Sequence, residues 1–279
     1  MEIFELKKIA TQVRRDVIRM ISNANSGHPG GALGCADFLV VLFFKHLRID
    51  PEKFTMSGDN EDIFILSNGH VCAALYSVLA RRGYFPLSEL STFRKLNSRL
   101  QGHPSVHTGL PGIRISTGSL GQGLSFGIGM AIGKKLKNDP YLVYVLLGDG
   151  EIQEGQVWEA IAFASAHKID NLIAIVDNND LQIDGSIYNV FPFNIKEKFE
   201  AFGWITLSMN GHDFNDMLNT LNDAVSLSNK NKPIAIIMKT VLGMGVDFMM
   251  NNHKWHGTPP NQEQTRLALN QLPETLYDF

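Results

Sequence analysis

Cysteine is scarce in this sequence, which has only Cys35 and Cys72 among its 279 residues. Two thiols, each in an apolar neighbourhood, cannot build a disulfide framework or a thiolate metal site. Long hydrophobic runs are also missing, because the longest, Phe38 to Phe44, is far too short to cross a bilayer. The amino terminus has the pattern of a charged helix and not of a signal peptide. These absences predict a protein of the reducing cytoplasm without a membrane segment.

A large excess of charge of one sign is missing as well. The 28 acidic and 25 basic residues leave a formal net charge of −3, and no dense basic stripe is present, so nucleic acid is not an expected partner. What is plentiful is apolar surface and glycine: 44% of the residues are hydrophobic and 25 are glycine. We therefore expect a globular chain with a sizeable core, forming one domain over residues 1–279 with a helical extension at its amino terminus.

The order of apolar patterns along the chain predicts an α/β fold. Runs rich in β-branched residues, as in strands buried on both faces, lie at Tyr141–Leu147, Leu172–Val176 and Ile234–Met238, with a weaker run at Ile63–Leu66. Helical patterns lie at Ile3–Ile21, Cys35–His46, Leu120–Lys137, Trp158–His167, Lys196–Phe202 and Phe214–Ser228. This alternation predicts a doubly wound, mostly parallel sheet with helices on both faces. Ligand sites in such sheets form at the carboxyl ends of the strands.

Two polar segments stand at predicted strand ends. Asp149, between Gly148 and Gly150, follows one strand, and Asn179 follows the next, 30 positions further along. A lone GDG triplet is more often a plain strand-to-helix turn. Here, however, a parallel sheet would place Asp149 beside Asn179. Their side-chain oxygens, with a nearby backbone carbonyl such as that of Leu181, make a set suited to Mg²⁺, and ligand phosphates would complete the octahedron.

The motifs around these residues carry a resemblance to a known family. GDG followed at this interval by an asparagine pair resembles the thiamine-diphosphate signature, and GDGEIQEG with VDNNDLQIDG resembles transketolase in particular. The resemblance covers nearly the whole chain, because NANSGHPGGALG, LSNGH, QGHP, STGSLGQG and HKWHG occur in the order found in the amino-terminal half of a transketolase. It implies the diphosphate-binding (PP) domain of the thiamine-diphosphate fold, with Mg²⁺, or Ca²⁺ or Mn²⁺ in its place. The reaction it implies is reversible transfer of a two-carbon ketol unit from a ketose, usually phosphorylated, to an aldose.

The glycine-rich segment from Ser116 has two interpretations. Gly121, Gly123 and Gly127 approximate a dinucleotide-binding turn, but no clear strand precedes them and no acidic residue follows at the distance that a ribose contact requires. A glycine turn that opens a helix can nevertheless present N–H groups to a diphosphate. The resemblance to transketolase implies a cofactor-binding set that consists of His70, Gly118, Ser119, Leu120, Gly148, Asp149, Gly150, Glu151, Asn179 and His253.

Histidines in glycine-containing turns form the second informative group. A single turn histidine is more often structural, but a site that moves protons among sugar hydroxyls uses imidazoles near operating pH. The resemblance implies that His28, His70, His103 and His253 line the thiazolium and the sugar hydroxyls, with His256 as a close competitor of His253. The segment before HKWHG departs from the family pattern, which leaves the preferred sugar open. For Arg94 a phosphate contact is conceivable, but we expect a solvated helix arginine.

The resemblance also implies a partner chain. Glu154 and Glu159 match interface glutamates of transketolases, although acids at a helix start are an equal alternative. The glutamate that acts on the aminopyrimidine comes, in the family, from a second domain that would follow Phe279. We therefore expect a natural short subunit that is inactive without a carboxy-terminal transketolase subunit, in a heterotetramer with two copies of each chain.

Three alternatives remain open at this point. One keeps the cofactor and changes the substrate: a specialised sugar transketolase, or an enzyme similar to deoxyxylulose-phosphate synthase. Another is a non-catalytic regulatory subunit with the same fold, and the third is a nicotinamide-dependent dehydrogenase. The intact Asp149, Asn179 and His70 favour a working site over the regulatory subunit, and the absent ribose-binding acid disfavours the dehydrogenase.

Overall fold

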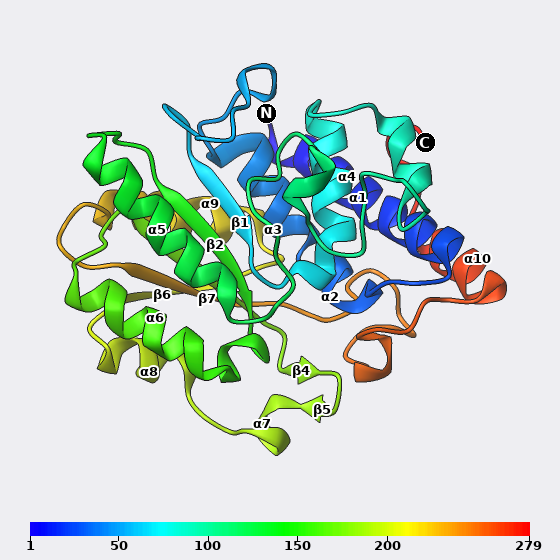
Figure 1. Ribbon diagram of the computed structural model, residues 1–279. Helices are drawn as coiled ribbons and strands as arrows, with labels where there is room; N and C mark the ends of the chain where they lie inside the picture. Colours follow the sequence, from blue (N-terminus) through cyan, green and yellow to red (C-terminus); the bar gives the residue numbers. More distant parts are fainter.

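The computed structural model describes all 279 residues and contains a five-stranded sheet in which every neighbouring pair runs parallel (Figure 1). In spatial order the strands are β1 (Ile63–Leu66), β2 (Val143–Gly148), β3 (Leu172–Asn178), β7 (Ile234–Lys239) and β6 (Ile205–Asn210). The four strands predicted from apolar runs are present, and the predicted parallel α/β sheet is confirmed. Strand β6 was not predicted. It lies at the edge of the sheet, where Met209 alone of its six residues is buried, so it has no continuous apolar run.

Ten α-helices and a small hairpin surround this sheet. The hairpin consists of β4 (Leu181–Gln182) and β5 (Gly185–Ser186). The helices are α1 (Ile3–Ala24), α2 (Pro29–Gly34), α3 (Ala36–Val41), α4 (Cys72–Arg82), α5 (Gln122–Leu136), α6 (Gly155–Ala166), α7 (Ile187–Val190), α8 (Ile195–Ala201), α9 (Phe214–Leu227) and α10 (Gln262–Gln271). None of them combines the length and the apolar character that crossing a bilayer requires.

The sheet separates two apolar cores because successive strand residues point to opposite faces. Phe64, Tyr144 and Ile173 face the core that contains α1, α3, α4 and α9, whereas Ile65, Val145 and Ala174 face the core built with α5, α6 and α8. Figure 1 shows these helices on the two sides of the sheet. Burial on both faces explains why the central strands are apolar throughout.

Several predicted helix boundaries needed correction. The helix expected at Cys35–His46 is α3 followed by a π-helical turn at Leu42–His46, and α6 begins at Gly155 instead of Trp158. Helices α2, α4 and α10 were not predicted. Nine of the eleven residues of α4 are buried, so it lacks the one-sided apolar stripe that reveals a surface helix.

Buried ion pairs fix the helices next to the carboxyl ends of the strands. Arg14 of α1 donates two hydrogen bonds of 2.7 Å to Asp37 of α3, and its Nε donates to the carbonyl of Leu33 in α2 at 3.1 Å. His212, just after β6, also bonds Asp37 at 2.9 Å through Nδ1, and its Nε2 accepts from the backbone N–H of Val241. One arginine and one carboxylate thus hold α2, and the loop that precedes it, against the sheet.

Candidate active site

A cavity of about 480 Å³ opens at the carboxyl ends of β1, β2 and β3. Turns after these strands and the loops before α2 and α5 supply its walls. The structure brings thirteen of the predicted site residues to this cavity: His28, His70, His103, Gly118, Leu120, Gly148, Asp149, Gly150, Glu151, Glu154, Asn179, Leu181 and His256. Three others, Ser119, Glu159 and His253, do not line it.

Asp149 and Asn179 meet because β2 and β3 are paired in register. Gly148 lies opposite Asp177, which puts the residues after both strands side by side. Asp149 is buried, and its carboxylate accepts from the backbone N–H of Gly150 at 2.8 Å and of Asp180 at 2.6 Å. The Asn179 side-chain oxygen accepts from the N–H of Leu181 at 3.0 Å. The predicted neighbourhood of carboxylate, amide and Leu181 is therefore present.

The electrostatics of this corner suit a bound cation. Burial, reinforced by the nearby charge of Asp177, raises the pKa of Asp149 to about 8, and burial raises the pKa of Asp177 to about 6. Two acids that are costly to ionise together become favourable once a positive ion lies beside them. The side-chain oxygen of Asn68, at the same cavity, is buried and has no hydrogen-bond partner in the chain. A hard cation with oxygen ligands fits this donor set.

Glu151 ties three segments of the cavity wall together. One carboxylate oxygen accepts from Ser67 Oγ at 2.5 Å, after β1, and from the N–H of Gly121 at 3.0 Å, before α5. The other accepts from the N–H of Gly148 at 2.9 Å, at the end of β2. Burial raises the pKa of this carboxyl despite these bonds. Glu151 thus borders the cavity, but its oxygens are committed to the wall itself.

Glycines allow the turn before α5 to approach the other wall closely. Gly118 has a φ of 113° and Gly121 a φ of 87°, values that side chains other than glycine rarely adopt. A Cβ atom on Gly69 would lie 2.7 Å from the backbone nitrogen of Gly118, so that site also requires glycine. The chain enters this turn from a loop and not from a strand, which removes the dinucleotide-binding interpretation.

Four histidines gather at the other side of the cavity. The ring of His28 lies 5.1 Å from that of His70, 6.5 Å from that of His103 and 5.9 Å from that of His256, and His70 and His256 are 5.1 Å apart. Burial and the neighbouring imidazoles lower the pKa of His28 to about 4 and that of His70 to about 3. Desolvation also lowers the pKa of His103 and of His256. All four rings are consequently neutral at physiological pH.

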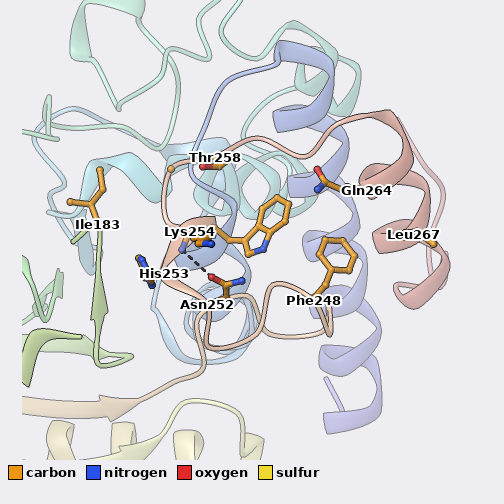
Figure 2. Close-up of a pocket in the computed structure, with 10 residues that line it drawn as sticks. Ile183, Phe248, Asn252, His253, Lys254, Thr258, Gln264 and Leu267 are labelled. Carbon is orange, nitrogen blue, oxygen red and sulfur yellow. Dashed lines mark hydrogen bonds between the residues drawn. The ribbon is translucent and has the colours of Figure 1, made fainter. Parts of the chain in front are cut away.

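His253 lies in a second hollow of about 880 Å³, next to the cavity (Figure 2). Ile183 borders both spaces, and Phe248, Asn252, Lys254 and Trp255 line the hollow with His253. The backbone N–H of Lys254 donates to Asn252 at 3.2 Å, the bond drawn in Figure 2. A short 3₁₀ turn at His253–Trp255 separates the two histidines, so that His256, and not His253, faces the other imidazoles.

Two further residues lie elsewhere than the sequence alone indicated. Glu159 lines a groove between α5 and α6. Arg94 is not a solvated helix arginine: it follows the 3₁₀ turn at Leu87–Thr92, has a φ of 56° and is half-buried. The sequence analysis also missed Asn68 and Gln182 in the cavity wall. Both sit inside quoted motifs, where the neighbouring His70 and Asp149 drew the interpretation.

Comparison with known proteins assigns the family. The family described as "Transketolase, thiamine diphosphate binding domain" matches residues 6–274. The chain belongs to the transketolase family. It is 36% identical to one of the named subunits of the apulose-4-phosphate transketolase of Phocaeicola vulgatus, over 99% of this chain and 96% of that protein. It is 34% identical to the 6-deoxy-6-sulfo-D-fructose transketolase subunit SqwG of a Clostridium species, over 96% of each chain.

The fold of this transketolase-family chain also matches solved structures. Transketolase from Campylobacter jejuni superposes with a TM-score of 0.89 at 38% identity, over 98% of this chain. The match spans only 43% of that enzyme's chain, so this chain corresponds to its thiamine-diphosphate-binding part. Relatives of the same length that are named as single subunits of a transketolase imply that a partner subunit exists.

Proposed function

We propose that the chain is the amino-terminal, diphosphate-binding subunit of a two-chain transketolase. The reaction is reversible transfer of a two-carbon ketol unit from a ketose to an aldose. The observation that carries this proposal is the cavity itself, where a cation-binding corner and a cluster of neutral histidines face one ligand-sized space. Alignment over 96% of the length of two relatives that are named as transketolase subunits supports the two-chain organisation.

Asp149, Asn179 and the carbonyl of Leu181 would hold Mg²⁺, for which Ca²⁺ or Mn²⁺ can substitute. The glycine turn at Gly118, with Leu120, would present backbone N–H groups to the diphosphate, as the first turn of a helix does for anions. Thiamine diphosphate, when bound, supplies the electron sink for breaking a carbon–carbon bond next to a carbonyl. The protein contributes position, a dry surrounding and proton transfer.

The histidines would handle the protons. Nδ1 of His28 and Nδ1 of His256 are buried and have no partner in the chain, so each is free to bond a sugar hydroxyl. A neutral imidazole can accept a proton at one nitrogen while the other donates, which suits a reaction that deprotonates and reprotonates hydroxyls. His70 and His103 complete the ring of imidazoles. His253, in the adjoining hollow, is a more distant contact in this proposal.

The partner subunit would supply the glutamate that acts on the aminopyrimidine. Among the chain's own glutamates at the cavity, Glu151 already accepts three hydrogen bonds, and Glu154 is exposed at the rim. We place Glu154 and Glu159 at subunit contacts in a heterotetramer of two copies of each chain. The two cysteines are free and buried, which is compatible with a cytoplasmic enzyme.

The substrate would be a phosphorylated or otherwise anionic sugar. The names of two relatives concern such sugars, apulose 4-phosphate and 6-deoxy-6-sulfo-D-fructose. Lys254, exposed on the hollow next to the cavity, is a cation within that neighbourhood. A sugar outside the ordinary set of transketolase substrates therefore stays a candidate for this chain.

The test is a coupled ketol-transfer assay on the purified chain with thiamine diphosphate and Mg²⁺, first alone and then with an equal concentration of a candidate carboxy-terminal subunit. We expect no transfer by the chain alone and activity with the partner. Full activity without a partner would overturn the two-chain proposal. Absence of activity with every partner, despite cofactor binding, would favour a non-catalytic subunit.

A further inference from the structure

Arg94 bridges the two loops that carry His28 and His103. Its Nη1 donates to Ser26 Oγ at 2.8 Å, and its Nη2 donates to the carbonyl of Gly102 at 3.2 Å. Ser26 is two residues before His28, and Gly102 immediately precedes His103. A single planar guanidinium therefore sets the spacing of two loops that are far apart in the sequence.

The surroundings of Arg94 are shaped to hold this guanidinium. A Cβ atom on Gly102 would lie 2.8 Å from Arg94 Cζ, so any larger residue there would push the arginine away. The backbone of Arg94 adopts the left-handed conformation, with a φ of 56°, and its N–H donates to the carbonyl of Leu100 at 2.8 Å. A non-glycine residue keeps this unfavourable conformation only where other contacts enforce it.

The charge of Arg94 is not neutralised by an acid. No carboxylate lies within 4.0 Å of it, whereas Arg99 of the same loop pairs with Glu89 at 2.6 Å. After burial, the charged groups that act on the pKa of His28 are His256, Arg94 and His103, and all of them lower it. For His103 the only such group is Arg94, which also lowers the pKa.

We propose that Arg94 is a positioning residue of the histidine cluster: it fixes the His28 and His103 loops and, as an unpaired cation beside both rings, keeps them uncharged. Arg94 does not border the cavity, so it acts through the two rings and not on a ligand directly. The proposal deepens the proposed function, because neutral rings are what hydroxyl proton transfer needs. The titration that tests it depends on the folded chain alone.

The experiment follows the histidine ring resonances of isotope-labelled full chain between pH 5 and 8, with His28→Gln and His103→Gln used for assignment. Arg94→Gln removes the charge and one arm of the bridge, Arg94→Lys retains the charge, and Arg99→Gln removes an arginine of the same loop as a control. We expect the His28 and His103 rings to begin titrating within this range in Arg94→Gln only. In the reconstituted enzyme, the acid limb of kcat/KM should move to higher pH in the same variant.

Folded Arg94→Gln protein whose His28 and His103 remain neutral down to pH 5 would overturn the proposal. The same holds if Arg99→Gln shifts these rings as much as Arg94→Gln does. Should Arg94→Gln not fold, Arg94→Lys carries the test, because rings that titrate despite the retained charge would contradict the role of the cation. Failure of ketol transfer in the wild-type reconstitution would instead count against the proposed function and leave the titration result standing.

Discussion

Replacing Glu151 by alanine should destabilise the chain more than any other single change of an acid at the cavity. The change leaves three donors without their acceptor: Ser67 Oγ and the N–H groups of Gly121 and Gly148. A hydrogen bond to a charged group contributes roughly 1.5–3 kcal/mol. Three would sum to more than about 4 kcal/mol, but water can enter from the cavity and the buried carboxylate already carries a desolvation cost. We therefore expect a loss of about 4 kcal/mol in unfolding free energy.

Urea denaturation measures this loss as a lower midpoint with an unchanged slope, and a thermal scan should show a fall of roughly 8 °C. Glu151→Gln should cost less, because the amide oxygen can keep two of the three donors. Glu154→Ala is the matched control: its side chain is exposed and accepts no hydrogen bond, so the change should stay within about 0.5 kcal/mol. Equal midpoints for Glu151→Ala and Glu154→Ala would refute the view that Glu151 holds the three walls together.

Two further predictions concern the metal corner and the histidines. Asp149→Ala should fold and yet lose Mg²⁺-dependent binding of thiamine diphosphate, since the diphosphate charge is then poorly neutralised; calorimetry that finds unchanged affinity would count against the metal assignment. Burial, with His256 and His28, lowers the pKa of His70 to about 3 from an ordinary 6.5, so its neutral form stabilises the fold above pH 6.5 and that contribution is lost as the pH falls toward 3. His70→Gln should accordingly make the urea midpoint less dependent on pH between 7.5 and 5, and an unchanged dependence would contradict the burial of a neutral ring.

The sequence predicted those parts of the fold whose signal is local. β2, β3 and β7 are buried on both faces and show it as continuous apolar runs, as β2 does from Val143 to Leu147. β6 has mostly half-exposed residues at the sheet edge, and α4 is buried on every side, so neither has the periodicity on which such predictions rest. Their structures depend on neighbours that are distant in the sequence.

For the site, strand order was the deciding information. The position of Asp149 beside Asn179 follows from parallel pairing of consecutive strands, which the sequence could indicate. Whether His253 or His256 faces the cavity depends on the rotation of one 3₁₀ turn, and no pattern of residue types encodes that rotation. The role of Arg94 was also hidden, because Ser26 and Gly102, its two hydrogen-bond partners, lie on separate loops.

The two sides of the cavity place opposite demands on charge, and this orders how a ligand can lie. At the strand ends, the raised pKa of Asp149 means that the carboxylate becomes favourable only beside a cation. Around His28, burial and the guanidinium of Arg94 oppose any further positive charge. A ligand with an anionic end that carries its own metal ion and an uncharged, hydroxyl-rich end satisfies both sides in one orientation only. The reversed orientation would bring a cation to the histidines and leave the acids uncompensated. The charge pattern of this chain therefore selects the direction of binding before any partner chain is added.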